Sequence, residues 1–74
     1  MIINVKTPPT HRRPDLQNKS IKVEDGKTVQ QFMADVKLSD SSVDYVLINK
    51  KKADVTQTLQ HGDQISFIPM MSGG

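Results

Sequence analysis

The chain closes with residues 59–74, which have the sequence LQHGDQISFIPMMSGG. The residues His61-Gly62-Asp63 have the composition of a tight turn, and the alternating segment 64–68 has the period-2 pattern of a β-strand. Pro69 lacks a backbone N–H, so it predicts the end of this strand's hydrogen-bond ladder. The stretch therefore predicts a folded domain of residues 1–69 followed by a short, flexible C-terminal tail, residues 70–74, that ends in Gly-Gly.

Three more strands and one irregular segment are indicated upstream of this stretch. Residues 1–6 are rich in β-branched side chains and residues 20–24 alternate, so we expect a hairpin whose long connection is the Pro-rich segment 7–19. Residues 43–49 predict a further strand, apolar at both parities from Tyr45 to Ile48. That pattern is typical of a strand covered on both faces, or of one with a functional exposed face. Residues 51–60 are expected to be irregular.

One helix is predicted over residues 28–37. Thr28 stands three residues before Gln31, the spacing of a capping box. The apolar residues Val29, Phe32, Met33 and Val36 follow at i, i+3, i+4 and i+7, which places them on one buried face. The element order is then strand, strand, helix, strand, irregular crossover, strand. It predicts an α+β, β-grasp (ubiquitin-like) fold, with a mixed four- to five-stranded sheet covered on one face by one main helix.

Composition narrows the class of protein. The chain has 74 residues, a formal net charge of +2 and no cysteine, which excludes disulfide scaffolds, thiolate metal sites and a cysteine nucleophile. A charge bias this small does not indicate a nucleic-acid partner. No apolar segment suggests a secretory signal or a membrane span. We expect a cytoplasmic protein with no nucleic-acid or membrane partner, monomeric when free.

The chemistry-bearing side chains do not assemble into a recognisable catalytic or metal site. His11 and His61 fall in separate loops without acidic or cysteine ligands at metal spacing, so no metal site is expected. The basic runs 11–13 and 50–52 are interpreted as solvated loop charges, and the first of them is expected to help dock an acidic partner. We therefore predict no catalytic residue and no intrinsically bound cofactor, and expect that the chain is not an enzyme.

The closing stretch resembles the end of the ThiS/MoaD family of sulfur-carrier proteins. The shared pattern is a leucine, two residues, Gly62-Asp63, an alternating strand, Pro69, a short linker and a terminal Gly-Gly. The segment Val46-Leu47-Ile48-Asn49 is similar to a family strand that ends in Asn before a turn, and residues 26–29 are similar to the turn into its helix. The resemblance covers roughly residues 20–74.

This resemblance implies a chemical cycle at the C-terminus. An E1-like adenylating enzyme, using its own ATP, would adenylate the carboxylate of Gly74, with Gly73 and Ser72 threading the tail into its active site. A sulfur donor would then convert the adenylate to a thiocarboxylate. The thiocarboxylate would pass its sulfur to a synthase in cofactor biosynthesis, either thiazole synthase for thiamin or the large subunit of molybdopterin synthase for the molybdenum cofactor. The sequence leaves the product open.

Two other functions stay open at this point. The activated Gly74 could meet a lysine amine instead, which would make the chain a ubiquitin-like protein modifier. Alternatively, the fold could be a non-covalent β-grasp interaction module.

A docking surface is predicted beside the tail. Ile68 has the opposite strand parity to Ile65 and Phe67, so it faces away from the helix if those two face it. Together with Met70 and Met71 it forms a predicted partner-binding patch, because exposed apolar clusters commonly mark interfaces. Val46 and Ile48 would extend the patch if their parity matches.

Overall fold

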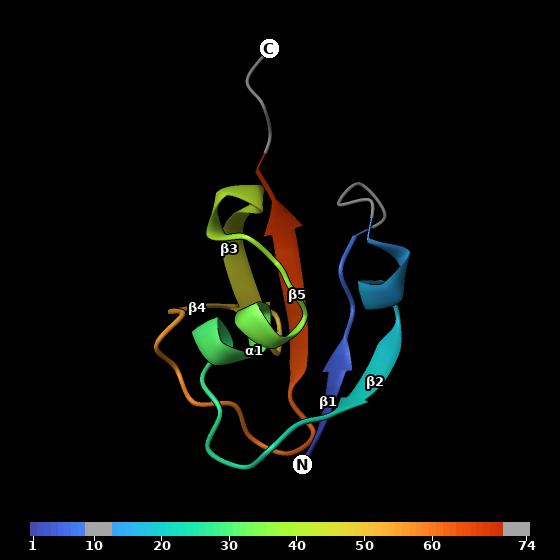
Figure 1. Ribbon diagram of the computed structural model, residues 1–74, viewed down its shortest axis with the longest axis vertical. Coiled ribbons are helices and arrows are strands. Elements are labelled where there is room, and N and C mark those ends of the chain that lie inside the picture. Colours follow the sequence, from blue (N-terminus) through green and yellow to red (C-terminus); the bar gives the residue numbers. More distant parts are fainter. Residues whose placement is uncertain (9–12, 71–74) are drawn as a thin grey trace.

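The computed structural model describes residues 1–8 and 13–70. In this part of the chain one α-helix crosses one face of a five-stranded sheet (Figure 1). The helix is α1 (Val29–Asp35), and the short 3-10 helices are η2 (Pro14–Leu16) and η3 (Asp40–Ser42). The strands are β1 (Ile2–Val5), β2 (Lys19–Lys22), β3 (Val43–Ile48), β4 (Lys51–Ala53) and β5 (Gln64–Pro69).

The last strand in the sequence is the central strand of the sheet. The strand order is β2-β1-β5-β3-β4. β1 and β2 form the expected antiparallel hairpin, while β5 runs parallel to β1 and antiparallel to β3. The sheet is therefore mixed, and the predicted α+β β-grasp architecture is confirmed.

Helix α1 begins as the sequence predicts and ends two residues earlier. The Thr28 hydroxyl accepts a hydrogen bond from Gln31 N (3.3 Å), and the Gln31 side chain accepts one from Thr28 N (3.0 Å), which completes a capping box. At the other end Lys37 has a φ of 58°, and its N–H bonds Ala34 O (3.1 Å) while Leu38 N bonds Met33 O (2.8 Å). This Schellman motif turns the chain away before residue 37 can extend the helix.

The core lies between α1 and one face of the sheet. Phe32 from the helix and Phe67 from β5 are both buried, and their rings stack with centroids 6.1 Å apart. Aromatic pairs at such distances contribute more than their buried area alone. The inner sheet positions that complete this core, all buried, are Ile3, Val5, Val43, Val46, Ile48 and Ile65.

Two segments differ from the sequence-based expectation. Residues 51–60 were predicted irregular, but β4 occupies the first three, paired antiparallel with β3. Its lysines carry no apolar alternation, so backbone hydrogen bonds rather than side-chain burial hold this edge strand. The long connection 7–19 contains η2, and its Leu16 is fully buried, with Thr7 N donating to Leu16 O at 3.0 Å. That leucine anchors the loop to the core.

Candidate functional site

The base of the predicted tail is fixed by the central strand. β5 is paired on both sides, and beyond its last residue Met70 N donates to Ser42 O at 3.3 Å. The Met70 side chain is 53% exposed. The other predicted tail and patch residues, Met71, Ser72, Gly73 and Gly74, lie outside the described residues. The structure does define the position of Met70, the residue from which they continue.

The sheet face opposite α1 carries an apolar patch next to that point. Ile68 is half-buried and stands opposite Tyr45 in the β3–β5 pair, and residues in direct register share a face. Leu47, two residues along β3, is also half-buried on this face. We call Tyr45, Leu47 and Ile68 the outer patch. The predicted outward parity of Ile68 is confirmed.

The proposed extension of the patch to Val46 and Ile48 is wrong. Val46 is paired with Phe67 and Ile48 with Ile65, so both point into the core, where they are 2% and 6% exposed. The alternate residues of the same strand take their place. The sequence run from Tyr45 to Ile48 is apolar at both parities because one half packs under α1 and the other half forms the outer patch.

A lysine borders the outer patch. Lys52 of β4 is paired with Leu47, and its Nζ lies 4.8 Å from the centroid of the Tyr45 ring. A cation over an aromatic face contributes about 0.5–1 kcal/mol at an exposed site. The sequence analysis placed residue 52 in a solvated turn; only the register of β4 shows that it lies beside the apolar residues of β3.

At the end of β5 opposite the tail, a hydrogen bond joins Asn49 and Asp63, two residues of the sequence pattern shared with the ThiS/MoaD family. Asn49 Nδ2 donates to Asp63 Oδ1 (3.0 Å), and Asn49 Oδ1 accepts from Gln64 N (3.0 Å). Asp63 Oδ2 also accepts from Gln60 N at 2.8 Å, and the Asp63 residue is 9% exposed. Asn49 and Asp63 thus join the β3–β4 turn to the turn before β5. They set the start of the strand whose other end carries the tail.

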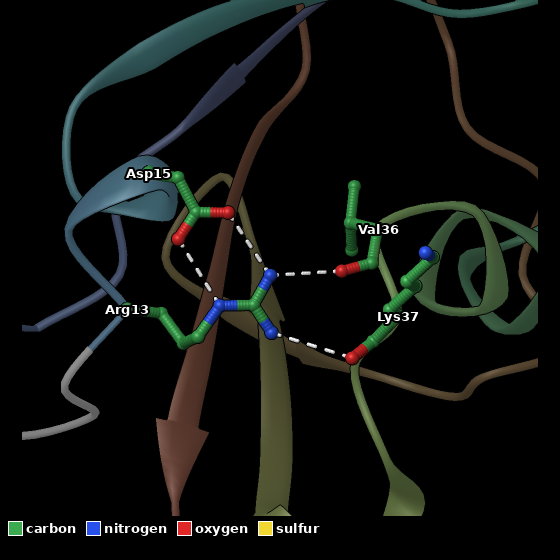
Figure 2. A network of polar contacts seen from close by, with 4 residues as sticks. All are labelled: Arg13, Asp15, Val36 and Lys37. Carbon is green, nitrogen blue, oxygen red and sulfur yellow. Dashed lines mark hydrogen bonds and ion pairs between the residues drawn. The ribbon is translucent and has the colours of Figure 1, made fainter.

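Arg13 joins the long loop to the end of the helix (Figure 2). Its Nε and Nη2 donate to the two carboxylate oxygens of Asp15 (3.0 and 2.9 Å), and Nη2 and Nη1 reach Val36 O (2.8 Å) and Lys37 O (3.3 Å). Helix α1 has no basic residue in its last turn, so Arg13 supplies the positive charge that a helix C-terminus favours. The hydrogen bond from Arg13 lowers the pKa of Asp15, and the same hydrogen bond raises the pKa of Arg13.

The histidines and charged loops do not form a metal centre in the described residues. The His61 ring is exposed, and its Nδ1 accepts a hydrogen bond from Ile2 N at 3.0 Å. His11 lies outside the described residues. Across residues 1–8 and 13–70 there is no group of three or more His, Cys, Asp or Glu side chains placed to hold a metal ion. Among the helices of that same part, none has the length and apolar character needed to cross a membrane.

Comparison with known proteins gives matches in sequence and in structure. The profile of the ThiS family matches residues 10–74. The chain is similar in structure to SAMP1 from Haloferax volcanii, with a TM-score of 0.72, 19% identity and 100% of both chains covered. It is also similar to a chain in the complex of subunits 1 and 2 of the molybdopterin-converting factor from Helicobacter pylori 26695, with a TM-score of 0.68, 22% identity and 100% of both chains covered. No curated protein sequence gives a significant match. The two solved structures support the fold assigned above.

Proposed function

Because the chain belongs to the ThiS family, we propose that it is a sulfur-carrier protein that is activated at the carboxylate of Gly74. The observation that carries the proposal is the family match over residues 10–74, which includes β5 and the Gly-Gly sequence beyond it. The fold supports it, since β5 is anchored to β1 at its start and to β3 along its length, and Met70 N at the base of the tail donates to Ser42 O.

The proposed chemistry proceeds in two displacements. A carboxylate is a poor acyl donor, so one of its oxygens first attacks the α-phosphate of ATP on an E1-like enzyme, giving an acyl-adenylate and releasing pyrophosphate. The sulfur of a donor at the oxidation level of hydrosulfide then attacks the acyl carbon and expels AMP, and loss of the proton from that sulfur leaves the C-terminal thiocarboxylate. In this scheme the chain is a protein cosubstrate, and the partner enzyme supplies the catalytic groups and the ATP site. We propose that the reaction takes place in the cytoplasm, where ATP is available.

The geometry of the tail base suits such a cosubstrate. Four residues follow Met70 in the sequence. An extended chain spans at most about 3.3–3.6 Å per residue, so Gly74 reaches no more than about 14 Å beyond Met70. The partner must therefore bind the domain close to the end of β5. Gly73 and Ser72 are small, so they would let the tail pass through a narrow channel of the partner enzyme.

The outer patch is the proposed contact for that binding. Ile68 lies on the open face of the sheet immediately before the tail, and exposed Met70 follows it. With Met71 they would present adaptable apolar side chains to the adenylating enzyme and then to the synthase that accepts the sulfur. We propose that this synthase makes either the thiazole of thiamin or molybdopterin. The molybdopterin alternative is supported by the similarity in fold to a chain of the molybdopterin-converting factor complex.

ATP–pyrophosphate exchange tests the proposal. The enzyme used is the E1-like adenylating enzyme from the same genome that acts on ThiS-family chains. The wild-type chain should support exchange, whereas a chain lacking Gly74 and a chain with one alanine added after Gly74 should not, because each displaces the reactive carboxylate. Thermal unfolding of both variants should match wild type. Full exchange with the shortened chain would contradict activation at Gly74.

Mass spectrometry of the chain isolated from its native cells tests the fate of the activated glycine. The proposal expects a fraction in which one oxygen of Gly74 is exchanged for sulfur. Gly74 joined to lysine side chains of other proteins, without any thiocarboxylate, would show a protein modifier instead. An unmodified chain that supports no exchange would leave a non-covalent interaction module as the better description.

A further inference from the structure

The open face of the sheet carries positive charge without a carboxylate in its paired positions. The outward-facing paired residues are Ile2, Asn4, Ser20, Lys22, Tyr45, Leu47, Lys52, Gln64, Ser66 and Ile68. Asp44 lies at the irregularity between Val43 and Tyr45, and with Asp54 it lines a hollow at the edge of the outer patch that Tyr45 also lines. The carboxylate of Asp63 is used by Asn49 and Gln60. The face is thus cationic and partly apolar.

A polar hollow lies on the other side of β5 from the outer patch. Asn4, Ser20 and Gln64 line it from the open face, whereas Lys19, which is paired with Val5, lines it from the end of the edge strand β2. Its volume is about 220 Å³, and its lining residues are Asn4, Lys6, Asn18, Lys19, Ser20 and Gln64. Each of these side chains can donate a hydrogen bond and none is acidic. The Ser20 hydroxyl donates to Asn4 Oδ1 at 2.9 Å, which occupies the amide oxygen and leaves the amide NH₂ as the group that can meet a ligand. The hollow is therefore suited to an anion.

The hollow and the outer patch lie on either side of the strand that leads to the tail. Lys6 N donates to Ile65 O at 2.8 Å, which fixes Lys6 beside the start of β5. Ile68 is three residues further along and pairs with Tyr45 on the opposite side of β5. Lys6 and Lys52 therefore lie on opposite sides of the strand that leads to the tail.

We propose that the surface that docks on this face is an acidic protein surface. Carboxylates of that partner pair with Lys6 and Lys19 in the hollow, and another pairs with Lys52, while apolar side chains cover the outer patch. The inference rests on the proposed function and deepens it, because it names the chemistry of the adenylating enzyme's docking surface. Charge complementarity of this kind raises the association rate and fixes the orientation of binding.

The mixture of apolar and cationic groups favours a protein over a phosphate polymer. Tyr45 is the single aromatic residue among the outward paired positions, and Lys52 already covers its ring. Single-stranded nucleic acids bind to rows of exposed aromatic side chains in strongly basic grooves. The formal net charge of +2 is small for such a polyanion site. A protein can match a three-residue apolar patch and a few lysines at once.

Binding of the full-length chain to the adenylating enzyme, measured without ATP, tests the proposal. We expect the double variant Lys6→Glu/Lys19→Glu to bind about tenfold or more weakly at about 0.05 M salt, mainly through a slower association rate. The difference should largely disappear at about 1 M salt, where the Debye length falls to about 3 Å. Lys37→Glu is the matched control for each single variant, because it makes the same change of two charge units on the helix side of the sheet. Each single variant should lose less affinity than the double and more than Lys37→Glu.

Three results would overturn the proposal. The first is an unchanged affinity of the double variant at low salt. The second is a loss of affinity for Lys37→Glu equal to that of either single variant. The third is wild-type protein that binds single-stranded RNA or phosphatidylserine vesicles more tightly than it binds the adenylating enzyme. A failure of the proposed function is recognised separately. In that case the wild-type chain binds with the expected salt dependence but supports no pyrophosphate exchange once ATP is added.

Discussion

The two faces of the sheet use alternate residues of the same strands and differ sharply in how they are covered. In β5, Ile65 and Phe67 face α1 and are fully buried, whereas Ile68 faces away and keeps part of its surface exposed. In β3, Val46 is buried while its neighbour Leu47 is only half-buried. Burying one such side chain fully contributes about 1.5–3 kcal/mol. Folding therefore accounts for the apolar residues of the inner face.

The apolar residues of the outer face have no comparable folding reason. In the described part of the chain no second layer of helices or strands covers that face of the sheet (Figure 1). The outer patch includes Ile68, which is two residues before Met70. The difference between the faces teaches that one strand can meet two requirements at once, with alternate positions used for packing and the positions between them free, under the proposed function, for contact with another protein. The substitutions below are designed to separate the two.

The largest effect is expected from the inner face. Phe32→Ala removes a ring that stacks on Phe67 in the centre of the core, and should lower the free energy of unfolding by about 3–5 kcal/mol. Because small domains have limited total stability, much of the protein should then be unfolded at room temperature. Urea denaturation followed by circular dichroism measures the loss. A midpoint near wild type would contradict the assignment of Phe32 to the core.

A buried polar group in the turn before β5 should have the next largest effect. Asp63→Ala leaves Gln60 N and Asn49 Nδ2 without their carboxylate acceptor, and should cost about 1–3 kcal/mol of stability. Asp54 is the matched control, since its exposed carboxylate accepts from Thr56 N and Oγ1 at 3.0 Å. Asp54→Ala should cost less than about 1 kcal/mol. Equal losses in the two denaturation curves would remove the special role of Asp63.

The outer face should respond in binding rather than in stability. Ile68→Asp/Met70→Asp should weaken binding to the adenylating enzyme by more than about 1.4 kcal/mol, which is tenfold in Kd. The same pair should change the free energy of unfolding by no more than about 1 kcal/mol, because neither side chain is fully buried. Val46→Asp, one position from Tyr45 but buried, should instead unfold the protein. Calorimetric titration and denaturation together would show whether the faces differ in this way.

A smaller and opposite effect is expected at the β3–β4 turn. Asn49 and Lys50 have φ values of 52° and 70°, the signature of a type I′ hairpin turn, in which glycine is favoured at the second position. Lys50→Gly should therefore raise the free energy of unfolding by about 0.5–1 kcal/mol. Lys51→Gly, placed in the extended strand β4, should lower it by a similar amount. Chemical denaturation of both variants checks the sign of each change.

The smallest effect concerns the loop and depends on pH. The pKa of Asp15 is lowered in the folded protein by its hydrogen bonds from Arg13. Its stabilising contribution is therefore present above the unfolded-state pKa of about 3.9 and is lost as the pH falls through the lower folded-state pKa. Asp15→Asn should be slightly less stable than wild type at pH 7 and indistinguishable from it in strong acid. A difference that is constant from neutral pH to strong acid would assign the effect to something other than this carboxylate.

The elements that the sequence predicts well are those specified by local patterns. The capping box of Thr28 and Gln31, the spacing of Phe32 on the helix and the strand before Pro69 each depend on residues within one turn or one strand. The outward parity of Ile68 follows from the same alternation once Phe67 is assigned to the core. These features together identify the fold and the start of the tail. They can be predicted because the helix period of 3.6 residues and the strand period of 2 appear as the spacing of apolar residues close together in the sequence.

Other parts of the candidate site depend on register between distant segments, which no local pattern encodes. Strand β4 forms because its backbone pairs with β3, and only that pairing brings Lys52 over Tyr45. Likewise Arg13 reaches Val36 O across 23 residues, and the hollow that contains Lys6 needs β1, β2 and β5 side by side. The sequence by itself determined which side chains are apolar and at which local period. The tertiary structure decided which of them share a face, because hydrogen-bond register between strands is settled only when the whole sheet closes over one helix.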